Sequence, residues 1–184
     1  IGNHMKSKGT LKKDTIVVTV MSNLGFSIMA RENGINTEQT KVGDRYVLER
    51  MREIGASLGG EQSGHVIFLD ENTTGDGLLS ALHLLEVMVD TGKPLSELAN
   101  IMTVLPQALV NAMVPNHKKD SYMEYPEIAE AIAKLEEKFS GEGRVLIRPS
   151  GTEPKVRVMI EGKNQDEINK DAKELAELIQ NTIL

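Results

Sequence analysis

Residues 144–161 read RVLIRPSGTEPKVRVMIE. Apolar residues alternate with polar or longer ones on both sides of the central PSGTEP, as they do in two half-buried strands. Pro149 and Pro154 bracket the loop. Because neither proline has an N–H, neither can extend a strand ladder, and both stiffen the chain. The stretch therefore predicts a β-hairpin with a short, rigid tip.

The tip of this hairpin concentrates groups that bind a phosphate. Ser150 and Thr152 carry hydroxyls, and Gly151 between them lets a ligand approach the backbone closely. Arg148 and Arg157 stand at the two ends, and a guanidinium group matches phosphate oxygens with two parallel hydrogen bonds. With the backbone amides of the loop, these five residues predict a phosphate site, which we call the phosphate cup. The alternative is an ordinary turn with two solvated arginines.

Composition bounds the remaining possibilities. The 184 residues are 40% hydrophobic and 26% charged, as in an ordinary globular protein of one large or two modest domains. The net charge of −6 argues against general binding of nucleic acid. With no cysteine, there is no disulfide framework, thiolate nucleophile or Cys-type zinc site. No apolar run approaches the ~20 residues of a membrane span and no signal peptide is visible, so we expect a cytoplasmic protein.

Strands and helices alternate through the first part of the chain, which predicts an α/β layer domain with a mixed sheet. Residues 1–5 are either a cloning remnant or the end of a helix cut from a longer chain, and a start without Met favours a fragment. The expected elements are a strand at 15–21, a helix capped by Ser22 or Asn23 that ends at Gly34, a strand at 34–42, a helix capped by Asp44, a strand at 66–69, a helix at 78–91 capped by Asp76, and a helical piece at 96–102.

The period changes near residue 103, where we place the boundary between two domains, 1–102 and 103–184. The second part reads strand–helix–strand–strand–helix, which predicts a small antiparallel sheet covered on one face by two helices. The expected elements are a strand at 105–114, a polar loop at 115–122, a helix with Pro126 in its first turn, the hairpin, and a helix from Asn164 with Glu167 in a capping-box pattern.

A second polar loop precedes the strand at 66–69. Residues 60–65 read GEQSGH, so Glu61 and Ser63 stand among glycines at a strand edge. A carboxylate and a hydroxyl together suit sugar hydroxyls, each of which is both donor and acceptor. A plain β-turn would show the same residues, and His65 alone indicates a half-buried histidine. With four histidines and no carboxylates clustered near them, we expect no metal site.

These two loops, in this order, resemble those of the α-D-phosphohexomutases, which move phosphate between the 1- and 6-positions of a hexose. The third of that family's four domains carries a sugar-recognition loop of the form Gly-Glu-x-Ser-Gly-His, and the fourth carries a phosphate loop that residues 148–154 and Arg157 match in full. Gln62 and the stretches 42–47 and 74–78 are similar to the members that act on glucosamine phosphates. The resemblance covers nearly the entire chain.

The resemblance implies that the intact protein interconverts glucosamine 6-phosphate and glucosamine 1-phosphate, on the route to UDP-N-acetylglucosamine and cell-wall precursors. An active-site phosphoserine donates its phosphoryl group, and the bisphosphorylated intermediate then turns over in place. The resemblance places the sugar at Glu61, Ser63, Asp44 and Arg45, and the non-reacting phosphate at Arg148, Ser150, Gly151, Thr152 and Arg157.

The sequence departs from the family's pattern in one respect. It has no Ser-His-Asn-type phosphoserine loop and no Asp-x-Asp-x-Asp motif, which in the family lie in domains one and two, where the aspartates hold Mg²⁺. We therefore expect a substrate-binding half that is inactive and metal-free by itself and that works with domains one and two of the same chain. Two alternatives stay open: a fragment of a mutase acting on mannose or glucose phosphates, and a non-catalytic phosphosugar-binding module.

Overall fold

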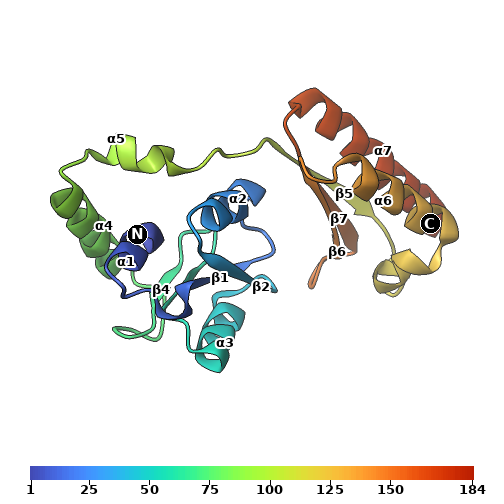
Figure 1. Ribbon diagram of the computed structural model, residues 1–184. Coiled ribbons are helices and arrows are strands. Elements are labelled where there is room, and N and C mark those ends of the chain that lie inside the picture. The colour runs from blue at the N-terminus through green and yellow to red at the C-terminus, as the bar shows by residue number, and fades with distance from the viewer. The chain divides into compact units, whose positions relative to one another are not determined.

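The computed structural model describes residues 1–184 and contains two compact units, Ile1–Val104 and Leu105–Leu184. Figure 1 shows the elements of each unit. The first unit is α/β with a mixed sheet and the second is α+β with an antiparallel sheet, which confirms the predicted fold class. No helix in either unit combines the length and the hydropathy needed to cross a lipid bilayer.

A four-stranded sheet in the order β2-β1-β3-β4 forms the centre of the first unit. Strand β1 runs parallel to β2 and β3, whereas β3 and β4 are antiparallel. The strands are β1 (Thr15–Thr19), β2 (Asn36–Thr40), β3 (Leu58–Gly60) and β4 (Val66–Phe68). All five residues of β1 are buried, as its apolar character predicts. Val17 belongs to one core cluster and its neighbours Ile16 and Val18 to another, so both faces of the sheet are covered.

The helices of the first unit follow the expected order. They are α1 (Gly2–Ser7), α2 (Leu24–Glu32), α3 (Asp44–Ile54), α4 (Gly77–Thr91) and α5 (Leu95–Leu98), with the 3₁₀ turns η1 (Lys12–Asp14) and η2 (Ala99–Ile101). Asn23 caps α2 and Asp76 caps α4, each accepting a backbone N–H at 3.0 Å, as predicted. Ile1 and Met5 at the start of the chain pack against the core cluster that contains Ile16.

Two expectations for this unit are wrong. Asp44 does not cap α3: Gly43, with a φ of 132°, holds the cap position, and Asp44 accepts the N–H of its neighbour Arg45 at 2.8 Å. Gly60, expected in the polar loop at 60–65, is instead the last residue of strand β3. A Cβ on Gly59 would lie 2.5 Å from the sulfur of Met51, so close packing of α3 on the sheet requires a glycine in this strand.

The second unit is a three-stranded antiparallel sheet with two long helices. The strand order is β5-β7-β6, with strands β5 (Gln107–Met113), β6 (Arg144–Pro149) and β7 (Lys155–Glu161). Helices α6 (Pro126–Lys138) and α7 (Gln165–Ile183) lie on one side of this sheet in Figure 1, as predicted. Part of the expected polar loop is instead the 3₁₀ turn η3 (Lys119–Glu124).

Helix α7 supplies most of the core of this unit. Its predicted apolar stripe is buried at every position: Ile168, Ala172, Leu175, Ile179 and Ile183. Asn164 caps the helix by accepting two N–H groups, at 3.1 and 3.2 Å. The capping box is only half formed, because the carboxylate of Glu167 pairs with the Lys138 ammonium at 2.9 Å.

The base of the β6–β7 hairpin holds a buried charge pair. Glu161 is completely buried, and its Oε2 lies 2.5 Å from Nε of Arg144. Its Oε1 accepts the side-chain amide of Gln107 at 3.1 Å. Buried charges persist only when they are paired and hydrogen-bonded in this way, so the contact ties all three strands together.

Candidate phosphate and sugar sites

The hairpin brings the two predicted arginines together. Arg148 and Arg157 are direct partners in the antiparallel register of β6 and β7. Side chains directly opposite each other point to the same face of a sheet, so both guanidinium groups stand on one side of the tip. Burial, and then the nearby charge of Arg157, lower the pKa of Arg148. Arg148 forms no ion pair with a carboxylate of the chain.

Arg157 has one carboxylate partner and a buried nitrogen that has none. A terminal nitrogen donates to Oε2 of Glu153 at 3.0 Å, whereas its Nε is buried and has no hydrogen-bond partner. The other oxygen of Glu153 lies 2.8 Å from the Lys155 ammonium. The hydrogen bond from Lys155, ahead of the contribution of Arg157, lowers the pKa of Glu153. Buried polar atoms almost always have a partner, so this Nε is an exception within the hairpin.

Gly151 and Thr152 form the exposed rim of the tip. Neither backbone N–H donates a hydrogen bond within the chain. A Cβ built on Gly151 meets no atom within 4 Å, and its φ is outside the left-handed range. Neither crowding nor backbone conformation therefore requires glycine here. The absent side chain leaves room outside the loop, where a ligand can reach the two amides.

Ser150 is buried, unlike the exposed Gly151 and Thr152. It is 3% exposed, and its hydroxyl oxygen accepts the N–H of Glu153 at 3.2 Å. Its own N–H donates to the carbonyl of Lys155 at 2.9 Å, and its carbonyl accepts the ammonium of Lys119 at 2.5 Å. In this conformation Ser150 fixes the shape of the loop from within. No sequence pattern singles out Lys119, which is one of two consecutive lysines in a segment that reads as polar loop.

The second predicted loop, 60–65, is held against the start of α3. Glu61, with its side chain 10% exposed, accepts the N–H of Gly43 at 2.8 Å, which brings the loop beside Asp44 and Arg45. The hydroxyl of Ser63 lies 3.1 Å from Nδ1 of His65. The structure therefore gathers all four predicted sugar residues at one edge of the sheet.

Two of these residues have partners that the sequence did not indicate. Arg45 pairs with Glu49 at 3.0 Å, one turn further along α3. His65, expected to be half-buried, is exposed, and it lies 3.5 Å from the second oxygen of Glu61. The contact between Arg45 and Glu49 is at the surface, where an ion pair contributes at most about 1 kcal/mol, so a ligand can replace it.

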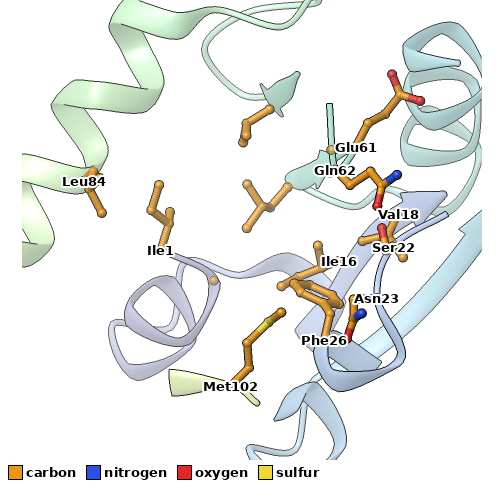
Figure 2. A pocket seen from close by; sticks show the side chains of 15 residues that line it. Ile1, Ile16, Val18, Ser22, Asn23, Phe26, Glu61, Gln62, Leu84 and Met102 are labelled. Carbon is orange, nitrogen blue, oxygen red and sulfur yellow. The ribbon is translucent and has the colours of Figure 1, made fainter. Parts of the chain in front are cut away.

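A cavity of about 480 Å³ lies next to the loop that carries Glu61 and Gln62. Figure 2 shows that most of the side chains around it are apolar, among them Ile16, Phe26 and Met102. A sugar phosphate needs convergent polar groups around its hydroxyls and charge. We therefore do not assign the substrate to this cavity.

One cluster in the chain has the residue types of a metal site. Ligand atoms of His4, Glu86 and Asp90 lie within 4.8 Å of one another. Asp90 already accepts from the Lys8 ammonium and lies 3.1 Å from Nε2 of His4. Mg²⁺ prefers an octahedron of oxygen ligands without a competing cation, so these residues do not match a magnesium site.

The two units match two descriptions of one protein family. Residues 1–105 match "Phosphoglucomutase/phosphomannomutase, alpha/beta/alpha domain III", and residues 109–178 match the C-terminal domain of the same family. The chain belongs to the phosphoglucomutase/phosphomannomutase family. The resemblance to the phosphohexomutases, predicted from the two loops, is thereby confirmed.

Close bacterial relatives of this phosphoglucomutase/phosphomannomutase chain carry a more specific name. The phosphoglucosamine mutase of Ruminiclostridium cellulolyticum is 61% identical over 180 residues, which cover 98% of this chain and 40% of that protein. The phosphoglucosamine mutase of Caldicellulosiruptor saccharolyticus is 59% identical over 183 residues, which cover 100% of this chain and 41% of that protein. The chain thus spans about two fifths of the length of these relatives.

Solved structures of the family share the fold. Aspergillus fumigatus N-acetylphosphoglucosamine mutase, in complex with GlcNAc-6P and magnesium, superimposes with a TM-score of 0.77 at 20% identity, over 100% of this chain and 42% of that one. An N-acetylglucosamine-phosphate mutase of the α-D-phosphohexomutase superfamily, in its substrate complex, gives a TM-score of 0.72 at 25% identity, over 90% of this chain and 38% of that one.

Proposed function

We propose that this chain is the substrate-binding half of a phosphoglucosamine mutase, an isomerase that interconverts glucosamine 6-phosphate and glucosamine 1-phosphate. The observation that carries the proposal is the phosphate cup, where two arginines stand on one face of a hairpin tip beside two free backbone amides. The name shared by relatives about 60% identical supports the choice of a hexosamine phosphate.

The charge of the cup matches a phosphate monoester. Such an ester carries about −1.5 to −2 charges at pH 7. Arg148 has no carboxylate partner, and Arg157 has one, Glu153, which contacts a single terminal nitrogen. Two guanidinium groups and two amides therefore offer a full set of donors to three phosphate oxygens. Thr152 adds a hydroxyl at the exposed rim, and Ser150 keeps the loop in shape.

The second loop supplies recognition of the sugar. We assign residues 1–102 to sugar recognition and residues 103–184 to phosphate binding. One oxygen of Glu61 accepts the N–H of Gly43, and we assign the second, which lies 3.5 Å from Nδ1 of His65, to a sugar hydroxyl. Ser63, Asp44 and Arg45 stand at the same edge and add one hydroxyl, one carboxylate and one cation.

This division of labour suits a reaction through a bisphosphorylated sugar. Either of the two phosphates must occupy the cup while the other reacts. The cup must therefore bind the phosphate equally well whether it is attached at the 1- or the 6-position of the sugar. Charge and backbone amides provide such tolerance, whereas the sugar loop provides the selectivity. The residues present supply no phosphoryl donor and no magnesium ligands. We therefore expect the chain alone to be inactive, with Mg²⁺ and the phosphoserine supplied by domains one and two.

A binding titration tests the cup directly. Glucosamine 6-phosphate is added to the ¹⁵N-labelled chain, and amide shifts are followed for wild type and for Arg148→Met and Arg157→Met. Each substitution is expected to weaken binding about 10- to 100-fold, because a charge-assisted hydrogen bond contributes about 1.5–3 kcal/mol. Lys170→Met, which removes an exposed cation on α7, is the charge control and should change the affinity less than about twofold. Shifts confined to another surface would refute the site.

Two alternatives are decided by further measurements. A mutase for mannose or glucose phosphates would turn over those sugars faster than glucosamine 6-phosphate in a substrate panel on the intact protein. A non-catalytic phosphosugar-binding module would bind in the titration above but show no turnover in the intact protein. Measurable mutase turnover by the 184-residue chain alone would contradict the proposed need for domains one and two.

A further inference from the structure

Lys119 is a buried lysine that forms no ion pair. It is 8% exposed and begins the 3₁₀ turn η3. Its ammonium donates to the carbonyl of Ser150 at 2.5 Å, inside the tip of the hairpin. A buried ammonium without a carboxylate is unfavourable, because a carbonyl dipole offsets only part of the lost hydration. The contact therefore calls for a reason beyond stability.

The contact sets the direction of one peptide group. The carbonyl of Ser150 and the N–H of Gly151 belong to the same peptide unit, which is trans because the chain has no cis bonds. In a trans peptide the C=O and the N–H point in opposite directions. Lys119 holds the carbonyl on the inner side of the loop, so the N–H of Gly151 is turned to the outer side. There it donates to no group of the chain.

A second contact keeps η3 in place. The hydroxyl of Tyr122, one turn after Lys119, lies 3.3 Å from the carbonyl of Ile147 in β6. Strand β6 is an edge strand, so its outer carbonyls are otherwise without a ladder partner. η3 thus covers this edge and places the lysine on the buried side of the tip.

We propose that Lys119 is a positioning residue of the phosphate cup. By holding the Ser150–Gly151 peptide, it aims the N–H of Gly151 at a bound phosphate, and its charge adds to the positive potential behind the loop. A donor that is already oriented costs less to order when the anion binds. This inference rests on the proposed function, because it assumes that the cup takes a phosphate.

The competing explanation is that Lys119 only stabilises the fold. The neighbouring residue, Lys118, offers a matched control. Lys118 also donates its ammonium to a backbone carbonyl, that of Ile183 at the end of α7, at 2.9 Å. Lys118→Met removes the same kind of contact from the same unit, away from the tip. Any general loss of stability should appear in both variants, whereas an effect on the amide of Gly151 should appear only in Lys119→Met.

The experiment is a titration of the ¹⁵N-labelled chain with sodium phosphate at constant ionic strength. In wild type we expect saturable shifts at Gly151 and Thr152. In Lys119→Met the affinity should fall about tenfold, as for one lost charge-assisted contact, and the shift of the Gly151 amide should shrink to less than half. In Lys118→Met the affinity should stay within about twofold of wild type, and Lys119→Arg, which keeps the donor, should recover most of the loss.

The outcomes separate the two proposals. A wild-type chain with no saturable shift in residues 148–157 refutes the phosphate cup itself. A wild-type chain that binds, with a folded Lys119→Met of equal affinity and an unchanged Gly151 shift, overturns only the role of Lys119. If Lys119→Met does not fold, hydrogen exchange in wild type decides: phosphate should protect the amide of Gly151 at least as strongly as that of Thr152, and protection of Thr152 alone overturns the inference.

Discussion

Substituting alanine for Gly151 should weaken phosphate binding without destabilising the fold. No atom lies within 4 Å of the position that the new methyl group would occupy, and the φ of Gly151 is one that alanine adopts. The substitution therefore creates no clash inside the chain. It does place a methyl group at the exposed rim, next to the free N–H groups that we assign to the phosphate.

Two magnitudes follow from this geometry. Glycine-to-alanine changes at unstrained positions stabilise by about 0.4–1 kcal/mol, because the unfolded chain loses freedom. For a unit of this size that raises the melting temperature by about 2–8 °C. Binding should change in the opposite sense: one amide contact to a charged oxygen contributes about 1.5–3 kcal/mol, so its loss weakens binding about 10- to 100-fold.

Calorimetry measures both quantities on the same protein, by thermal scans and by titration with orthophosphate. Gly77→Ala is the matched control, because a Cβ there also meets nothing within 4 Å and its φ is not left-handed. It should leave phosphate affinity unchanged. The reasoning fails if Gly151→Ala binds phosphate as tightly as wild type, or if it lowers the melting temperature.

Three further predictions concern other positions. Glu153→Gln should tighten orthophosphate binding about two- to fivefold, because the carboxylate of Glu153 competes with phosphate for the guanidinium of Arg157 through a surface ion pair. Weaker binding would show that Glu153 instead orients Arg157. Gly59→Ala should lower the stability of the first unit by about 1–3 kcal/mol in urea unfolding, since its Cβ would lie 2.5 Å from the sulfur of Met51. Asp76 has a lowered pKa because it accepts a backbone N–H at the start of α4, so its contribution to stability is present above about pH 4 and is lost as the pH falls through the folded pKa. The difference in melting temperature between wild type and Asp76→Ala should therefore shrink in acid, and a constant difference down to pH 2 would contradict this.

Regular periodicity made the second unit predictable from sequence. The spacing of Ile168 to Ile183 leaves one face of α7 apolar, and every member of that stripe is buried. The prolines around the tip limit the length of the loop, which favours pairing of the two strands that flank it. Their register places Arg148 opposite Arg157. Local pattern and tertiary structure agree here because each strand has its own alternation.

Other features depended on contacts that a linear pattern does not record. Strand β3 contains Gly59 and Gly60, which have low strand propensity, and it forms because β1 and β4 pair with it on both sides. The burial of Ser150 and the position of Lys119 depend on η3 folding back on the edge of β6. No spacing rule links residues 119 and 150, so only the tertiary structure could bring them together.

The buried pair of Arg144 and Glu161 has a consequence for the far end of the hairpin. If β6 slid by two residues along β7, every side chain would keep its face, yet Arg148 would stand opposite Lys155 or Met159 instead of Arg157. The same slip would leave the buried carboxylate of Glu161 without the guanidinium of Arg144, which costs about 3–5 kcal/mol. The charge pair at the base of the hairpin thus fixes the register of β6 and β7 at the tip. The loop at the tip can therefore change in composition while Arg148 and Arg157 stay opposite each other.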